Sequence, residues 1–322
     1  MRFMRAALCG MLLMLGLNLG PVARAADKVI AGSLGGQAPL WAIYVAVHKG
    51  FFAAEGLDLE LNFAQSGAAV TQQLTGGSLD VALSVGITDP IHAIEKGAPL
   101  ALIRIVGNAA PYVLITKPEI KSFADLKGKT ISSGAPNDVT NSYLVRMLEA
   151  NGLKKGDYDI ISAGVAASRY AALKAGVVAA AIVLPPLNFQ AQAAGFPTLG
   201  FAADYVKDFP FTGMAVHRRW ATANMSAAKR VLAATDKSVA WLADASHRGE
   251  AIELLVRVAK STKEDAEASY DLLERIGYFE PSSKISRKRL QNVIDAEKTS
   301  GTLDKAFALD RLVMPGVTEL TD

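Results

Sequence analysis

Cysteine is almost absent from this chain of 322 residues, and its single copy, Cys9, lies close to the start. Beyond that position the sequence has no disulfide, no thiol nucleophile and no thiolate metal ligand. A chain of this length does not need covalent cross-links, because it can bury a sizeable hydrophobic core.

A long apolar run is also missing, except near the first residues. Met1–Arg5 is positively charged, residues 6–19 are apolar, and Ala23–Ala25 has the small-x-small pattern of a cleavage site. The apolar stretch of about 14 residues is shorter than the roughly 20 that span a membrane. This order predicts a signal peptide at 1–25, cleaved after Ala25. We expect a soluble, exported chain without a lipid anchor, because Cys9 lies too early for acylation.

The chain has no large excess of charge of either sign. It contains 34 Lys and Arg against 31 Asp and Glu, but Arg2, Arg5 and Arg24 belong to the predicted signal. Cleavage would leave 31 of each, a formal net charge of zero. No basic excess remains to favour nucleic acid or an anionic membrane, so we predict no nucleic-acid partner.

Common catalytic motifs are missing as well. The sequence contains no GxSxG, HExxH or GxGxxG motif. Gly128–Thr130 resembles the end of a phosphate-binding loop, but Phe123 occupies the position of its first glycine. The four histidines are scattered and lack metal-ligand spacing. We therefore predict no catalytic residue, no metal and no cofactor.

The most informative pattern that is present follows the predicted cleavage site. Residues 28–31 form a short apolar run, and residues 39–50 place apolar residues at helical spacing behind Pro39, which suits a first helical position. Residues 57–63 alternate apolar and polar. β-branched residues within 39–50 also suit a strand, but the length of the segment favours a helix. A strand, a crossover helix and a second strand predict a parallel sheet.

The alternation of predicted strands and helices continues along the chain in two series. The second series begins at a predicted capping box, Ser122–Asp125. Residues 226–309 are then charged and helical in pattern, without convincing strands. No linker rich in Pro, Gly or Ser separates the series, which favours two lobes joined by crossing strands. We predict further strands at 80–84, 100–106, 112–116, 130–132, 159–162, 177–184, 198–201 and 212–216.

Several of these segments resemble one protein family. Pro39–Trp41, Lys49–Asp58 and Gly77–Ala82 are similar to the opening of solute-binding proteins of ABC importers. The similar branch is the nitrate/sulfonate/taurine and thiamine-pyrimidine-precursor group. Ser122–Thr130 resembles that group's entry to its second lobe. Ala172–Ala180 resembles a later stretch, with alanines in place of the usual acidic residue.

The resemblance implies an α/β fold of the two-lobe periplasmic-binding-protein kind, type II-like. Each lobe would have a mainly parallel sheet flanked by helices, and the chain would end in a helical region. Lobe I would comprise residues 28–110 and 213–322, and lobe II residues 111–211. The chain would cross between the lobes near 108–112 and 209–213.

The resemblance also implies a function. A monomer in the periplasm would capture a small solute, either anionic or aromatic and rich in heteroatoms, and deliver it to an inner-membrane ABC permease. One alternative is a protein that presents its ligand to a sensor kinase. A less favoured alternative is an enzyme on the same scaffold; the related pyrimidine-forming enzymes carry a cysteine cluster, which this chain lacks.

Loop composition predicts where the solute binds. Open α/β sheets bind ligands beyond the carboxyl ends of their strands, and five such loops are rich in small, hydroxyl or amide residues, namely 33–37, 66–67, 84–89, 133–137 and 184–188. Such residues also make ordinary turns and helix caps. We predict ligand contacts from Gln37, Trp41, Ser66, Thr88, Asn108, Tyr112, Ser133, Asn137 and Thr140.

Some of these expectations are more specific. Trp41 lies on the flank of the buried face of its predicted helix, where we expect it to wall the cleft; the alternative is a core tryptophan. The predicted helix at 138–151 begins with free N–H groups, so we expect an anionic or acceptor-bearing part of the solute there.

Charged residues near the predicted loops receive structural roles. Asp89 is predicted to be the N-cap of a helix that begins at Pro90, and a ligand contact is the less favoured alternative. Arg104 and Arg169 could each bind an anionic ligand, but ion pairs that serve the structure are the commoner use of such residues.

Overall fold

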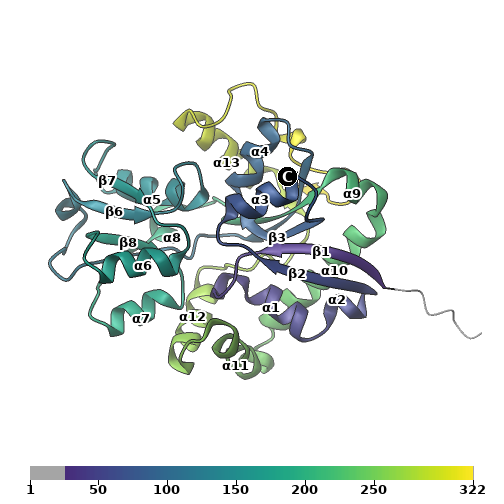
Figure 1. The fold of residues 1–322 in the computed structure, drawn as a ribbon, viewed down its shortest axis with the longest axis horizontal. Coiled ribbons are helices and arrows are strands. Elements are labelled where there is room, and N and C mark those ends of the chain that lie inside the picture. Colours follow the sequence, from purple (N-terminus) through teal and green to yellow (C-terminus); the bar gives the residue numbers. More distant parts are fainter. Residues whose placement is uncertain (1–25, 322) are drawn as a thin grey trace, which may run out of the picture.

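A computed structural model describes residues 26–321; the predicted signal peptide lies outside the described residues. Two sheets with flanking helices lie side by side along the long axis of the molecule (Figure 1). This arrangement confirms the predicted two-lobe α/β fold. We call the part around the first sheet lobe I and the part around the second sheet lobe II.

The sheet of lobe I has the strand order β2-β1-β3-β10-β4. Strand β1 is parallel to β2 and β3, whereas β10 is antiparallel to β3 and β4. The predicted strand at 57–63 is observed with exactly those bounds. The strands are β1 (Asp27–Ser33), β2 (Leu57–Phe63), β3 (Val81–Gly86), β4 (Leu100–Gly107) and β10 (Thr212–His217).

The sheet of lobe II has the order β7-β6-β8-β5-β9. Strand β6 is parallel to β7 and β8, and β5 is antiparallel to β8 and β9. The strands are β5 (Val113–Thr116), β6 (Thr130–Ser133), β7 (Asp159–Ser162), β8 (Ala180–Val183) and β9 (Thr198–Phe201).

Both sheets are therefore mixed, and in each the reversed strand follows a crossing. The chain passes from β4 to β5 through 108–112, and from β9 back to β10 through 202–211. A strand that enters from the other lobe starts at the edge facing that lobe, where the parallel strands end. The starts of β5 and β10 thus lie beside the carboxyl ends of their parallel neighbours. We keep the predicted lobe boundaries as a proposal; the first falls within a crossing segment and the second at the start of β10.

Helices cover both sheets, and their order follows the predicted alternation. Lobe I contains α1 (Trp41–His48), α2 (Phe51–Ala54), α3 (Gly67–Thr75) and α4 (Thr88–Glu95). Lobe II contains α5 (Val139–Ala150), α6 (Ala166–Lys174), α7 (Leu187–Ala193) and α8 (Ala202–Tyr205). The predicted capping box at Ser122 and Asp125 is present and starts a short 3₁₀ turn.

The C-terminal region is mainly helical, as predicted; two two-residue strands within it, β11 (Ile285–Ser286) and β12 (Leu320–Thr321), pair with each other. Helices α10 and α11 pack on α1, while α12 reaches both the turn before α1 and α7 of lobe II. No helix in the described part of the chain is long and apolar enough to cross a bilayer. The helices are α9 (Arg218–Ala223), α10 (Met225–Ala243), α11 (Arg248–Ala259), α12 (Lys263–Arg275) and α13 (Arg287–Ser300).

A buried arginine joins the sheet of lobe I to this helical region. Arg104 on β4 is fully buried, contacts the Asp236 carboxylate on α10, and donates from Nη2 to the Glu280 carbonyl at 2.6 Å. Burial lowers the pKa of Arg104, and the Asp236 charge opposes that shift. Arg104 therefore has the structural ion-pair role that the sequence favoured for it.

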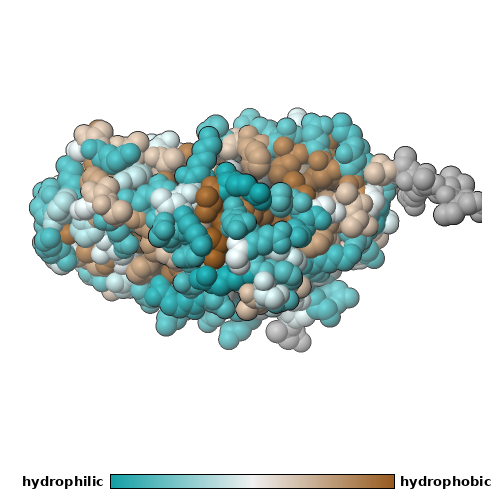
Figure 2. Space-filling model, turned by 90° about the horizontal axis from the view of Figure 1, so that it is seen from below, coloured by the Kyte–Doolittle hydropathy of each residue, from teal (hydrophilic) through white to brown (hydrophobic). Residues whose placement is uncertain are grey.

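Hydrophilic residues dominate the face of the molecule seen in Figure 2, and the apolar areas on it gather near the middle and over lobe I. Most large apolar side chains are buried in one continuous core that includes residues of both lobes.

Candidate ligand-binding site

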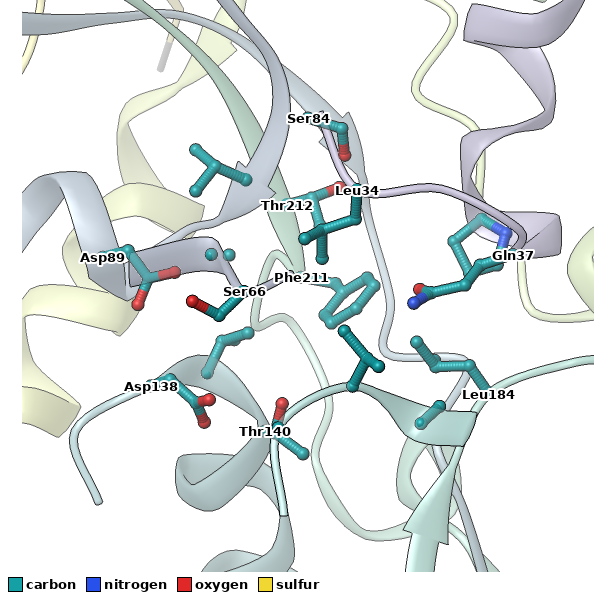
Figure 3. Close-up of a pocket in the computed structure, with 18 of the residues that line it drawn as sticks. Leu34, Gln37, Ser66, Ser84, Asp89, Asp138, Thr140, Leu184, Phe211 and Thr212 are labelled. Carbon is teal, nitrogen blue, oxygen red and sulfur yellow. The ribbon is translucent and has the colours of Figure 1, made fainter. Parts of the chain in front are cut away.

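A cavity of about 240 Å³ lies between the two lobes, where the carboxyl ends of the parallel strands face each other. Each of the five predicted loops contributes at least one lining residue. The crossing segments contribute Tyr112 and Phe211, and β10 contributes its first residue, Thr212, because the reversed strands start at this edge. Figure 3 shows the polar residues of lobe I above and those of lobe II below this space.

Four of the predicted contact residues line the cavity, namely Gln37, Ser66, Tyr112 and Thr140. The Ser66 Oγ is the N-cap of α3 and accepts a hydrogen bond of 3.1 Å from the Ala69 N–H. The Tyr112 and Thr140 hydroxyls share a hydrogen bond of 2.5 Å. The structure therefore brings these four together, and their contact with a solute stays a prediction.

Trp41 lies away from the cavity, so the expectation that it walls the cleft is wrong. Its side chain is 0% exposed, its indole N–H donates to the Ala251 carbonyl at 2.9 Å, and its ring packs edge-on against Tyr270. Both partners belong to the C-terminal helices that cover α1. The flank of α1 is buried by this second layer, and Trp41 is a core residue.

Four other predicted residues do not line the cavity. Thr88 and Ser133 are fully buried, and neither hydroxyl has a hydrogen-bond partner within the described residues. Asn137 is exposed to solvent. Asn108 lies in a different cavity, of about 520 Å³, and accepts a hydrogen bond from Arg289 there.

Asp89 has a different place from the one predicted. Helix α4 begins at Thr88 and the preceding Ile87 already has helical dihedral angles, so Asp89 lies in the first turn and is not the N-cap. Its carboxyl group lines the cavity and has no hydrogen-bond partner in the described part of the chain. Burial, reinforced by the nearby Asp138 charge, raises the pKa of Asp89 to about 8.

Asp138 presents a second carboxyl group from lobe II. It is the N-cap of α5, and its oxygens accept hydrogen bonds from the Ala135 N–H at 2.8 Å and the Asn141 N–H at 3.0 Å. Burial raises the pKa of Asp138, and these hydrogen bonds oppose the shift. The start of α5, where we expected an acceptor group of the solute, is thus already occupied by the chain's own carboxylate.

Arg169 on α6 is the positively charged residue of the lining. Its Nε donates to the Ile182 carbonyl and its Nη1 to the Gly164 carbonyl, both at 2.6 Å, and its guanidinium lies 6.0 Å from the Tyr112 ring centroid. Burial lowers the pKa of Arg169. No salt bridge of Arg169 forms among the described residues; two of its five N–H donors bind backbone carbonyls of lobe II.

Ser84 and Phe211 complete the interior. The Ser84 side chain is 2% exposed, and its Oγ lacks a hydrogen-bond partner within the described residues. Figure 3 shows this oxygen turned toward the cavity and the Phe211 ring near its centre. A buried hydroxyl without a partner costs free energy, which a bound polar group would recover.

The two lobes touch around the cavity. The Ala38 N–H of lobe I donates to the Pro185 carbonyl of lobe II at 3.1 Å. On the other side, Glu297 of α13 accepts from the Ser142 hydroxyl on α5 and lies 3.2 Å from His92 Nε2 on α4. These contacts describe a cleft closed from both sides.

Sequence reasoning missed Asp138 and favoured a capping role for Asp89 over a ligand contact. Both aspartates lie directly at predicted helix starts, within or beside the predicted loops. That position in the sequence could have identified them as residues of the cavity lining. No group of residues in the described part of the chain has the geometry of a metal site.

Comparisons with known proteins agree with this architecture. The model of the family described as NMT1/THI5 like matches residues 38–247, well over half of the chain. The formylaminopyrimidine-binding protein of Halalkalibacterium halodurans is 32% identical over 120 residues, which are 36% of this chain and 34% of that protein. That match therefore covers only about a third of the relative's length.

Two solved structures have the same fold. The alkanesulfonate-binding protein SsuA from Xanthomonas axonopodis pv. citri, bound to MOPS, has a TM-score of 0.75 at 19% identity, over 93% of this chain and 100% of that chain. The aliphatic sulphonate binding protein SsuA from Escherichia coli has a TM-score of 0.73 at 20% identity, over 92% and 94%. The chain belongs to the NMT1/THI5-like family and has the fold of periplasmic binding proteins.

Proposed function

We propose that this protein captures a small, heteroatom-rich solute between its lobes in the periplasm and delivers it to an ABC importer. The observation that carries this proposal is the cavity lined by residues of both lobes and of both crossing segments. Its volume lies below the roughly 300–1,000 Å³ of pockets for drug-sized ligands. The similar proteins described above, a formylaminopyrimidine-binding protein and two sulfonate-binding proteins, support a small solute.

The mechanism is hinge closure. The crossing segments at 108–112 and 206–211 connect the lobes, so a rotation about them opens the cavity to solvent and closes it on the solute. The permease would then recognise the closed form of a monomer. A catalytic role is not favoured, because none of the lining residues is a histidine, cysteine or lysine that could activate a nucleophile.

A bound solute is expected to stabilise and contract the protein. Since a ligand that binds only the folded chain adds about 2.7 kcal/mol at a hundredfold excess over Kd, the melting temperature should rise. Native mass spectrometry of the undenatured protein should reveal a co-purified solute. Small-angle scattering before and after its removal should show a smaller radius of gyration with solute bound. An equal radius in both states would contradict hinge closure.

Export is expected to remove the first 25 residues. We propose cleavage after Ala25, because the Ala23–Ala25 pattern fits signal peptidase and a site one residue later does not. The intact mass of protein from the periplasmic fraction should correspond to a chain that starts at Ala26. A mass that includes Cys9, with or without lipid, would contradict this.

A further inference from the structure

A second cavity lies beside the crossing segments, on the side away from the cleft. It has a volume of about 520 Å³, and we call it the hinge cavity. Asn108, which follows β4, and Phe201, which ends β9, line it, and β4 and β9 are edge strands of the two sheets. The cleft lies instead at the loops after β1, β3, β6 and β8. The two cavities share no lining residue.

Aromatic side chains separate the two cavities. Phe211 lines the cleft, and its ring centroid lies 6.2 Å from that of the fully buried Tyr278. Tyr278 directly follows Gly277, which lines the hinge cavity. The crossing segments and this aromatic layer thus form the axis between the cavities. A rotation about that axis that opens the cleft narrows the hinge cavity.

Two unpaired charges of opposite sign line the hinge cavity. Asp204 lies in the first turn of α8 in lobe II, and Arg275 is the last residue of α12, in the helical region that covers lobe I. Both are exposed, and neither has an ion pair or hydrogen bond among the described residues. The Arg275 guanidinium lies over the Phe201 ring, 5.3 Å from its centroid, and α8 begins at the next residue.

The other charges of the hinge cavity are Lys207, Asp208 and Arg289. Arg289 donates to the Asn108 side chain and pairs with the Glu280 carboxylate at 3.4 Å. Lys207 and Asp208 are neighbours in the second crossing segment, so their opposite charges largely offset each other. Arg275 and Asp204 therefore remain as the two charges that come from different lobes and have no partner.

We propose that Arg275 and Asp204 form an ion pair when the cleft opens, so that the hinge cavity stabilises the open form. This inference goes beyond the proposed function but relies on its hinge closure. In the closed form the width of the cavity keeps the two charges apart, and opening brings them together. An exposed ion pair is worth about as much as one of the interlobe hydrogen bonds that opening breaks. The pair would therefore keep the empty protein from remaining closed.

The test measures the distance between the lobes in the solute-free protein. The chain has no cysteine beyond Cys9 in the predicted signal, so spin labels attach only at introduced positions. Gln73→Cys on α3 and Ala171→Cys on α6 are exposed and lie outside both cavities. Unfolding and refolding remove any co-purified solute, and native mass spectrometry verifies that the protein is empty. Pulsed EPR then gives the populations of the open and closed forms.

Asp204→Asn is the main variant, because Asp204 has no partner in the closed form. The ratio of open to closed protein should fall by roughly two- to fivefold, the effect of an exposed ion pair. Asp204→Glu should keep the wild-type ratio, and the exchange of charges in Asp204→Arg with Arg275→Asp should restore it. Asp310→Asn is the control, since it breaks the exposed pair with Arg287 outside the cavity, and it should change nothing. Thermal unfolding shows whether each variant is folded.

Salt gives an independent readout of the same pair. The difference between wild type and Asp204→Asn should shrink as the ionic strength rises from about 0.05 to about 0.5 M, because salt screens exposed charges. Lobes that open without solute, but to the same extent in Asp204→Asn as in wild type, would overturn this inference and leave the proposed function standing. A label distance that is the same with and without solute would overturn both.

Discussion

Replacing Gly86 by alanine should prevent the lobes from closing fully. Gly86 ends β3 in lobe I, and a Cβ added there would lie 2.6 Å from Val139 Cγ1, on the first residue of α5 in lobe II. Overpacking of this kind costs about 1–3 kcal/mol. The larger clash, with Val139, arises only in the closed form, whereas the 3.3 Å contact with Asp89 Oδ2 lies within lobe I. Solute affinity should drop by up to that amount, while unfolding of the solute-free protein changes less. Calorimetry and small-angle scattering would measure the two effects.

Two further variants test whether the contact with Val139 causes the loss of affinity. Gly249→Ala is the control, because a Cβ at Gly249 would meet no atom within 4 Å. Val139→Ala in the Gly86→Ala background should restore part of the affinity, since it removes the Cγ1 at 2.6 Å and keeps the Cβ at 3.2 Å. Wild-type affinity and contraction in Gly86→Ala alone would show that the two lobes do not approach as described.

Asp236→Ala should lower the free energy of unfolding by about 3 kcal/mol, because it leaves the fully buried Arg104 cation without its carboxylate. This value is the lower end of the range for broken buried pairs, since the Asp236 side chain is 38% exposed. Urea unfolding of the solute-free protein at neutral pH would measure it. The affinity for solute should remain, because neither residue lines the cavity.

An exposed ion pair and a double variant serve as controls. Glu267→Ala breaks the exposed pair of Lys263 and Glu267 on α12 and should cost less than about 0.5 kcal/mol. Arg104→Met combined with Asp236→Leu should recover most of the lost stability, because it removes both charges. A change below about 1 kcal/mol in Asp236→Ala would mean that Arg104 is satisfied by the Glu280 carbonyl alone.

The fold could be predicted well where a pattern is local. The alternation in 57–63 depends on one buried face and predicted β2 with exact bounds. The mixed character of the sheets is different, because the direction of β10 depends on a return from the other lobe after about 100 residues of intervening chain. The period-two pattern of a strand is the same in a parallel and an antiparallel strand, so it cannot predict the direction of β10.

The site could be predicted as a set of loops but not as a set of side chains. The strand-end rule placed all five loops at the cavity. Within them, Ser133 and Thr88 point into the protein, which depends on the exact end of β6 and the exact start of α4. Trp41 was misplaced because Ala251 and Tyr270, which enclose it, lie more than 200 residues away in the chain.

The contacts around the closed cleft have a consequence for the empty protein. The Ala38–Pro185 hydrogen bond and the Ser142–Glu297 hydrogen bond join groups of the chain itself, so they stabilise the closed form whether or not a solute is bound. The unshielded Asp89 and Asp138 oppose that population, increasingly so as Asp89 ionises. The interlobe hydrogen bonds and the repulsion between the aspartates together set the fraction of solute-free protein that is closed. Closed protein without solute has the shape that a permease would recognise, so this fraction determines how strongly it competes with solute-bound protein for the transporter.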